Sequence, residues 1–201
     1  MNKQELSEEE YLAAYDASRY PKPAVTVDVL LIAKDKILLI KRGNHPQKNR
    51  WALPGGFINL DEELLSAAQR ELAEETGAKT EMLELIGVYG AVGRDPRDRI
   101  ISVAYGAVLP QEQACRGADD AAESQWFTYK LSQAAQGVNL ELKQGEVQLK
   151  CCCTLARLPV SGGLQVKEIL ASDLAFDHGQ IIIDGLLRLG KGDELLCAET
   201  I

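Results

Sequence analysis

The stretch GFINLDEELLSAAQRELAEETGA, residues 56–78, carries the clearest helix signal in the chain. Asn59, followed three residues later by Glu62, is typical of a capping box at the start of a helix. Gly77 is typical of the residue that ends one. The sequence therefore predicts a helix over Asn59–Thr76.

Three glutamates of this helix lie at unusual positions. At about 100° per residue, Glu71 and Glu75 lie within about 20° of Leu64, and Glu74 lies about 80° away. Leu64 belongs to the apolar face that should pack against the core. The residues that define this face are Leu64, Leu65, Ala68 and Leu72. Two carboxylates are thus predicted on the buried side, with a third at its edge.

Burying unpaired carboxylates costs several kcal/mol each, and like charges one helical turn apart repel. One interpretation is a solvated acidic face with Arg70 as a neighbour, but that suits a helix side that is polar throughout. A divalent cation held by several carboxylate oxygens removes both difficulties. Hard oxygen ligands favour Mg²⁺, with Mn²⁺ as an alternative.

The spacing of the fixed residues in this stretch resembles the Nudix box of the Nudix hydrolase superfamily. Ala78 departs from the pattern, because the family usually has a bulkier aliphatic residue there; this affects a packing contact and leaves the chemistry unchanged. The matching residues are Gly56, Glu62, Arg70, Glu71, Glu74, Glu75 and Gly77.

The resemblance implies a metal-dependent catalytic helix. It implies Glu71, Glu74 and Glu75 as metal ligands, with the backbone carbonyl of Gly56 as a further ligand. Glu71 and Glu74 are also candidate catalytic residues, and Glu71 is a candidate to orient or deprotonate the attacking water. Arg70, paired with Glu62, is implied to position the carboxylates. Such an ion neutralises a pyrophosphate and activates water.

The resemblance also implies an α/β fold of the Nudix type, an α/β/α sandwich with a mixed β-sheet and one catalytic helix. We expect one domain over residues 1–201, with residues 1–23 as an N-terminal helix (5–19) and lead-in. Residues 131–172 are longer than a minimal Nudix core needs and form an insertion of unknown role. A final helix is predicted from Asp177 to Leu189. Strands are predicted at Ala24–Ala33, Ile37–Lys41, Leu83–Tyr89 and Ile100–Leu109, with β-prone segments at Val138–Leu142 and Val147–Leu155.

Composition excludes several classes of protein. A net charge of −8 argues against a protein that coats nucleic acid, since phosphate-backbone binding requires a basic face. No apolar run approaches the ~20 residues of a membrane helix, and the polar N-terminus is no signal peptide, so a cytoplasmic location is expected. Five cysteines without a CxxC pair indicate neither a disulfide framework nor a zinc site.

Further stretches resemble the ADP-ribose pyrophosphatase-like branch of the superfamily, which implies hydrolysis of ADP-ribose to AMP and ribose 5-phosphate. A homodimer is expected from such relatives. The resemblance covers residues from about 15 to 127 and from 174 to 189. The stretches are YDASRYPKPAVTVDVLL, WALPGGF, GRDPRDRIISVAY, DDAAESQWF and LAFDHGQIIIDGLLRL.

The loop before residue 100 holds three arginines, Arg94, Arg97 and Arg99. Their guanidinium groups suit a clamp on the diphosphate or the terminal ribose, because an acidic protein needs local positive charge beside an anionic ligand. The alternative is a solvated hairpin tip balanced by Asp95 and Asp98. We expect at least one of these arginines to bind substrate.

A few other polar residues allow a functional and an ordinary interpretation. Asp120 and Glu123 precede a predicted strand, where relatives often place another metal-site carboxylate, but ordinary turn residues fit as well. His178 is a candidate substrate contact, whereas Asp177 with Gln180 also makes a plain helix cap. His45 lies in a polar loop and supports no assignment.

Two alternative functions remain open. An enzyme that removes oxidised nucleoside triphosphates would share the box. A regulator of NAD metabolism, with a Nudix-like sensor joined to a DNA-binding winged helix, would share the strand and loop stretches. The short acidic tail Lys191–Ile201 and the complete box favour the enzyme over this regulator.

Overall fold

A computed structural model describes residues 6–115, 123–135 and 137–192. Within these residues the strands form one mixed sheet with β1 at its centre, in the order β10-β9-β8-β7-β2-β1-β6-β5, and β3 and β4 pair with β2 and β1. The strands are β1 (Ala24–Ala33), β2 (Lys36–Lys41), β3 (Trp51–Ala52), β4 (Gly55–Phe57), β5 (Glu84–Tyr89), β6 (Ile100–Leu109), β7 (Ser124–Ala134), β8 (Gly137–Gln144), β9 (Val147–Arg157) and β10 (Leu164–Ser172).

The pairing of β1 explains the centre of the sheet. It forms the predicted hairpin with β2 and runs parallel to β6, from Ala24 opposite Ile100 to Ala33 opposite Leu109. Both faces of β1 are covered, which is why its sequence is almost continuously apolar rather than alternating. The predicted strands at the positions of β1, β2, β5 and β6 are confirmed within one residue.

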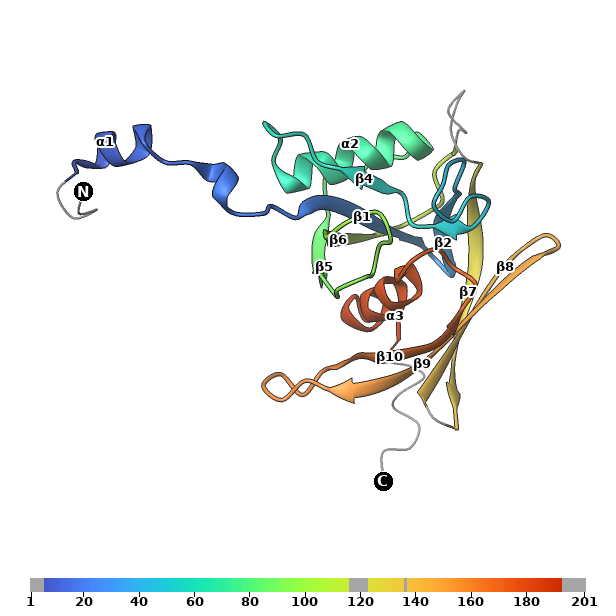
Figure 1. Cartoon of the computed structure of the whole chain (residues 1–201). Helices are drawn as coiled ribbons and strands as arrows, with labels where there is room; N and C mark the ends of the chain where they lie inside the picture. Colours follow the sequence, from blue (N-terminus) through green and yellow to red (C-terminus); the bar gives the residue numbers. More distant parts are fainter. Residues whose placement is uncertain (1–5, 116–122, 136, 193–201) are drawn as a thin grey trace.

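Two helices cover opposite faces of this sheet, α2 (Leu64–Thr76) and α3 (His178–Arg188) (Figure 1). Alternate residues of β1 point to the two sides, so Leu31 packs with Leu72 of α2 and Leu30 packs in the other core with α3. This is the expected α/β/α arrangement.

The predicted insertion at residues 131–172 is a sheet extension. Strands β8, β9 and β10 continue the antiparallel order from β7 and curve beneath α3 (Figure 1). Their inner faces, including Leu140, Cys151 and Val166, join the same buried core as Ile182 of α3. The segment thus supplies much of the apolar surface against which α3 is buried.

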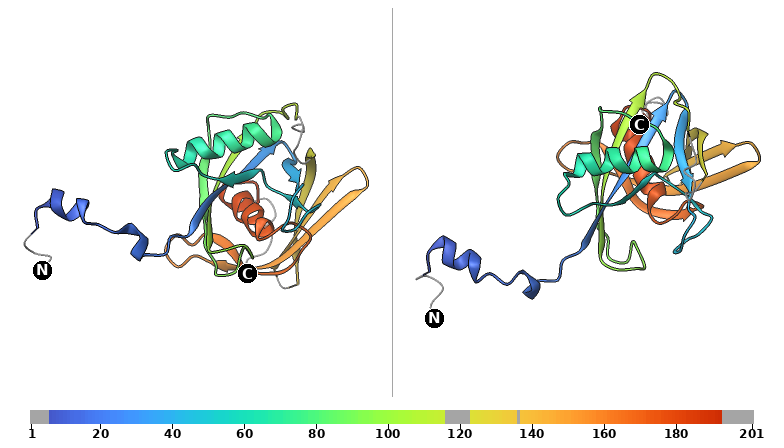
Figure 2. Two further views of the ribbon diagram at one scale, coloured as in Figure 1. Left: turned by 45° about the horizontal axis from the view of Figure 1, so that its top comes forward. Right: turned by 90° about the horizontal axis from the view of Figure 1, so that it is seen from above.

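The segment before β1 contains two short helices, α1 (Glu8–Ala13) and η1 (Ala17–Arg19), so the single helix predicted over residues 5–19 is wrong. The side chain of Asp16 accepts the backbone N–H of Ser18 and starts a separate turn, because Asp favours caps over helix interiors. Neither helix has a buried residue, and both lie away from the sheet in each view of Figure 2.

The start of α2 also differs from the expectation. The helix begins at Leu64 with Glu63 as its N-cap residue, so Asn59 is no cap. The backbone N–H of Asn59 does reach the Glu62 carboxylate at 3.2 Å, but in the turn before the helix. The same carboxylate is held by Arg70, which draws this turn toward the side of α2.

Among the residues that the structure describes, no helix is long and apolar enough to cross a membrane.

Candidate active site

The approach of β4 to α2 defines the first part of the site. β4 lies antiparallel beside β1, with Gly56 opposite Val27. A Cβ atom on Gly56 would lie 2.6 Å from the carboxylate oxygens of Glu71, closer than real Cβ contacts allow. Glycine at this position therefore lets the backbone meet the helix carboxylates directly.

Arg70 is the centre of the charged network on α2. Its guanidinium donates two hydrogen bonds to Glu62, at 2.8 and 2.9 Å. It also donates to Glu71 at 2.7 Å, to Glu74 at 3.1 Å and to the carbonyl oxygen of Phe57 at 3.1 Å. The predicted pairing of Arg70 with Glu62 is present, and the same cation balances three carboxylates.

The glutamates differ in exposure as the helix geometry indicates. The side chain of Glu71 is 13% exposed and that of Glu74 is 60% exposed. Glu75 lies on the buried side, where its carboxylate accepts the backbone N–H of Gly55 at 2.8 Å. Leu65, predicted on the apolar face, is instead exposed, because it lies in the first turn of α2 and the buried residues of the helix begin at Ala67.

Burial shifts the acidity of the two inner glutamates. Loss of solvation raises the pKa of Glu71, against the lowering effect of Arg70. Loss of solvation also raises the pKa of Glu75 to about 7, and the nearby negative charges of Glu71 and Asp28 add to the rise. A buried carboxylate with this environment is stabilised by an additional cation.

The predicted ligands are three glutamate carboxylates and the backbone carbonyl of Gly56. Oxygen atoms of this kind are the ligands that a hard divalent cation prefers. In the arrangement described here, Glu71 and Glu74 are bonded to Arg70 and Glu75 to Gly55. Across the described ranges, no three His, Cys, Asp or Glu side chains converge into a metal-binding group. The assignment of Glu71, Glu74, Glu75 and Gly56 as ligands stays a prediction.

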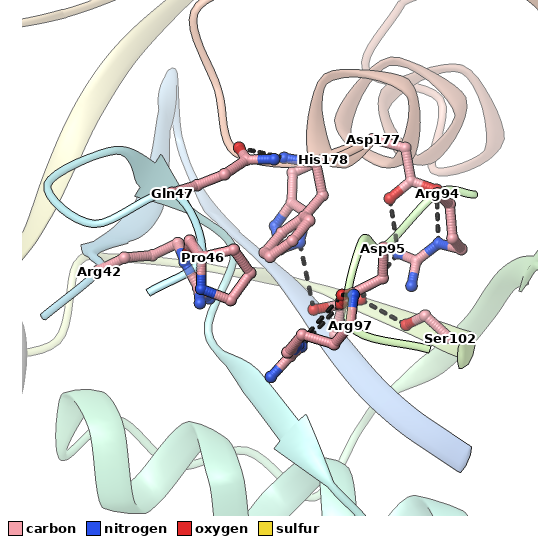
Figure 3. Close-up of polar contacts among 11 residues, drawn as sticks. Arg42, Pro46, Gln47, Arg94, Asp95, Arg97, Ser102, Asp177 and His178 are labelled. Carbon is pink, nitrogen blue, oxygen red and sulfur yellow. Dashed lines mark hydrogen bonds and ion pairs between the residues drawn. The ribbon is translucent and has the colours of Figure 1, made fainter. Parts of the chain in front are cut away.

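The three arginines of the loop before β6 have separate environments. Arg94 is 5% exposed and is bonded to both carboxylate oxygens of Asp177, at 2.5 and 2.7 Å (Figure 3). The side chain of Asp177 is therefore occupied and does not cap α3 as predicted. Arg97 pairs with Asp95 at 2.7 Å. Arg99 is exposed and does not line either of the two cavities described below.

A cavity of about 120 Å³ lies beside the Gly55–Gly56 backbone. Arg42 and Arg97 line it and bring positive charge to its walls. The guanidinium of Arg42 lies 4.7 Å from the ring centroid of Phe176, and that of Arg97 lies 5.1 Å from the ring of Phe57. The cavity thus combines guanidinium groups and aromatic faces next to the helix carboxylates.

A buried polar group lies in one wall of this cavity. The backbone N–H of Leu53 donates to Nδ1 of His178 at 2.8 Å, and Nε2 of His178 lies 3.7 Å from Asp28. Ser102 donates to the other oxygen of Asp28. Burial lowers the pKa of His178, so the imidazole is neutral and its proton is on Nε2, facing Asp28. His178 therefore anchors the loop that leads into β4.

The comparison with protein families agrees with this geometry. The sequence model of the NUDIX domain matches residues 22–144. The chain belongs to the Nudix family.

Two curated Nudix relatives have different functions. The chain is 37% identical over 191 residues to the ADPR responsive transcriptional repressor NtrR of Acinetobacter baylyi, covering 92% of this chain and 62% of the repressor. It is 43% identical over 108 residues to the ADP-ribose pyrophosphatase of Methanocaldococcus jannaschii, covering 54% of this chain and 63% of that enzyme. The chain therefore spans less than two thirds of either relative.

Solved Nudix structures confirm the fold. The NUDIX domain of Shewanella oneidensis NrtR, in complex with ADP ribose, is 30% identical with a TM-score of 0.65, covering 92% of this chain and 99% of that domain. A MutT/nudix family protein from Enterococcus faecalis is 30% identical with a TM-score of 0.72, covering 96% of this chain and 76% of that one. Nudix hydrolases generally use divalent metal ions.

The other predicted residues that the structure describes lie outside this Nudix site. Glu123 is exposed, and its carboxylate lies 3.5 Å from Lys41. Asp120 falls outside the described residues. His45 lies exposed in the loop after β2, and Gln180 lies on the first turn of α3.

Sequence reasoning missed four residues of the Nudix site. Arg42 gives no periodic or motif signal, because it lies in a polar loop. Phe176 lies in the stretch LAFDHGQIIIDGLLRL, whose resemblance to the branch did not single it out. Ser102 is hidden within an ordinary β-prone segment. Asp28 had a usable signal, since a lone carboxylate inside the apolar run AVTVDVLLIA needs a buried partner.

Proposed function

We propose that this chain is a divalent-metal-dependent Nudix hydrolase that cuts ADP-ribose into AMP and ribose 5-phosphate, with Mg²⁺ or Mn²⁺ as the ion. The observation that carries the proposal is the position of two partly buried carboxylates, Glu71 beside Gly56 and Glu75 beside Gly55, next to a cavity lined by Arg42 and Arg97. The likeness to an ADP-ribose pyrophosphatase and to an ADP-ribose-bound Nudix domain supports the choice of substrate.

The reaction consumes one water and produces no redox change. The water oxygen bonds to one phosphorus of the diphosphate, and the bond from that phosphorus to the bridging oxygen breaks. The bridging oxygen leaves with the other phosphate, so the products are AMP and ribose 5-phosphate. A divalent ion held by Glu71, Glu74, Glu75 and the Gly56 carbonyl would neutralise the diphosphate and acidify the attacking water.

The chain's own groups hold the reactants in place. Arg70 fixes the carboxylates of Glu71 and Glu74 through charge-assisted hydrogen bonds, so their oxygens lose little freedom on binding an ion. Glu71 is the candidate to accept the proton of the water, because its carboxylate lies against the Gly56 backbone. Arg42 and Arg97 supply positive charge for the phosphate oxygens.

The size of the cavity indicates which part of the substrate it holds. A volume of about 120 Å³ is well below the roughly 300–1,000 Å³ typical of whole ligand pockets. It suits the diphosphate, with the rest of the nucleotide on the surface beside it. The exposed ring of Phe57 offers a face on which a planar base can stack, whereas the ring of Phe176 is already in contact with Arg42 and His178.

Two other functions keep specific support. An ADP-ribose sensor without turnover has support in two relatives: this chain covers 99% of the ADP-ribose-bound NrtR Nudix domain, and it resembles a transcriptional repressor. Another Shewanella NrtR structure holds a 27mer DNA. We propose no nucleic-acid binding for this acidic chain. An enzyme acting on nucleoside triphosphates has support in the MutT-like relatives.

We also propose that the chain forms a homodimer through its N-terminal segment. Tyr11, Leu12, Tyr15 and Tyr20 are exposed there, and a six-residue helix such as α1 is marginal in water without a partner surface.

A panel assay tests the hydrolase. With Mg²⁺ the protein should release AMP and ribose 5-phosphate from ADP-ribose faster than it acts on NADH, ADP-glucose, dinucleoside polyphosphates or oxidised dGTP. Glu75→Gln should lower kcat/KM by more than about a hundredfold, because losing a direct ion ligand costs more than losing its support. Ser66→Ala, on the exposed side of α2, serves as the control.

Wild type could bind ADP-ribose without hydrolysing it, and Glu75→Gln could behave in the same way. That result would contradict the hydrolase and favour an ADP-ribose sensor. A sharp, specific shift of promoter DNA would add the regulator.

A further inference from the structure

A second and larger cavity lies on the α3 side of the sheet, away from the carboxylates of α2. Its volume is about 900 Å³. The walls are β5 with the residues that follow it, one side of α3, and the hairpin of β9 and β10. β5 and β10 are the two edges of the sheet, and both pack against α3 (Figure 1). The cavity fills the space between these edges.

The edge strands are already partly capped where they face this cavity. The backbone N–H of Val166 on β10 donates to Asp184 at 2.6 Å. The carbonyl oxygen of Ile86 on β5 accepts from Arg188 at 3.5 Å. Both strands also carry register irregularities. An added peptide strand would lack a regular ladder here, so a small molecule fits better than a strand.

The polar groups of the cavity are divided between its floor and its mouth. On the floor, the Asp184 carboxylate accepts from the hydroxyl of Tyr89 at 3.1 Å and from the side chain of Gln180, in addition to the N–H of Val166. At the mouth lie the exposed Arg157 and Arg188. A carboxylate accepts about four hydrogen bonds, so Asp184 retains one acceptor position for a ligand hydroxyl, and the amide oxygen of Gln180 is a further acceptor. The mouth offers cations for an anion.

The partners of the two mouth arginines leave them able to bind an anion. Arg157 donates to the backbone carbonyl of Gly162 at 3.1 Å. Arg188 lies 3.6 Å from Glu84, and both of these side chains are more than half exposed. One hydrogen bond to a carbonyl and one solvent-exposed ion pair hold these guanidinium groups only weakly. Several of their N–H donors therefore remain available to a ligand.

We propose that this cavity binds a small phosphorylated polyol, such as a pentose phosphate, with its hydroxyls at Asp184 and Gln180 and its phosphate at Arg157 and Arg188. A volume of about 900 Å³ is ample for such a molecule. The site is separate from the small cavity beside the Nudix box and does not depend on hydrolysis.

One ion pair connects the two cavities. Asp177 lines the larger cavity, and it holds Arg94, which lines the smaller one. The proposed ligand contacts, at Asp184, Gln180, Arg157 and Arg188, leave this ion pair intact. We therefore expect the two cavities to bind their ligands independently.

Calorimetric titration with ribose 5-phosphate tests the site. EDTA is present throughout, so that neither turnover nor an ion-dependent complex contributes. Wild type should bind ribose 5-phosphate, and both ribose and inorganic phosphate should bind at least about tenfold more weakly, because each lacks half of the contacts. Arg157→Ala should weaken binding about tenfold, because it removes one of the two cations proposed to hold the phosphate.

Two controls separate this site from the rest of the molecule. Lys150→Ala removes a positive charge from β9 outside the cavity, and Arg42→Ala removes one from the smaller cavity. Both should bind ribose 5-phosphate as wild type does.

The proposal is overturned if wild type shows no binding, if phosphate alone binds equally well, or if Arg42→Ala rather than Arg157→Ala weakens binding. A failure to hydrolyse ADP-ribose leaves the titration unchanged, so the two proposals are tested independently.

Discussion

Arg70 shows how one side chain can make a cluster of acids compatible with a folded helix. Its planar guanidinium reaches Glu62, Glu71 and Glu74 at once, and it also binds the carbonyl oxygen of Phe57. Without this cation, the half-buried Glu71 would face like charges in a poorly solvated setting. Lysine has a single charge centre and cannot reproduce these directed bonds.

We predict that Arg70→Ala raises the Mg²⁺ concentration needed for half-maximal hydrolysis by about 10–100-fold, because it removes the support of the ion ligands. Arg70→Lys should fall between this variant and wild type. A Mg²⁺ titration of the initial rate measures the effect, with Ser66→Ala as the control. An unchanged requirement in Arg70→Ala would show that the network does not position the ligands.

At the scale of elements, the predictable parts are those whose signal is local. The faces of α2 follow from its periodicity, and β1 and β6 follow from uninterrupted β-prone runs. The pairing of Arg94 with Asp177 joins residues 83 positions apart, and no local pattern encodes it. The curvature of β8 to β10 beneath α3 likewise depends on long-range pairing. The sequence therefore indicated β-prone segments here but not their positions in the sheet.

The alternation of β9 places Cys151 and Cys153 against α3, and both thiols are fully buried. Burial raises the pKa of Cys151 to about 11 and that of Cys153 to about 12. Above the ordinary thiol pKa of 9.0, the unfolded chain loses protons that the folded chain keeps. The folded state binds more protons in this window, so its stability falls as the pH rises.

We predict that the free energy of unfolding of wild type falls between pH 9 and 11 with an extra slope of up to about 1.4 kcal/mol per pH unit for each of these thiols. The double variant Cys151→Ala/Cys153→Ala should lose this extra slope, although the lost packing makes it less stable at every pH. Urea unfolding at several pH values measures both effects. Cys152→Ala keeps both buried thiols and should retain the wild-type slope; equal slopes in all three proteins would contradict the prediction.

At the scale of the whole molecule, the N-terminal segment stands apart from the sheet and its two helices (Figure 2). Its large apolar side chains are exposed, whereas those of β1 immediately after it are buried. Packing within the Nudix fold therefore does not explain the apolar side chains of this segment. The proposed contact with a second copy of the chain would bury them.

We predict that removing residues 1–20 weakens self-association by about tenfold or more and changes the stability of the domain by less than about 0.5 kcal/mol. Analytical ultracentrifugation over a concentration series measures the first effect, and urea unfolding of the monomer measures the second. Tyr11→Ser/Tyr15→Ser in the full chain should reproduce the loss of association. A dimer that persists unchanged in both variants would place the interface elsewhere.

The β9–β10 hairpin forms one wall of the larger cavity, and none of its described residues lines the smaller one. Substitutions, insertions or deletions at its tip would leave every residue of the Nudix box in place. The molecule thus separates the proposed reaction centre from a wall whose tip can be changed without altering it. A designer can exchange the tip of the hairpin to give the larger cavity a different ligand preference while the Nudix box stays as it is.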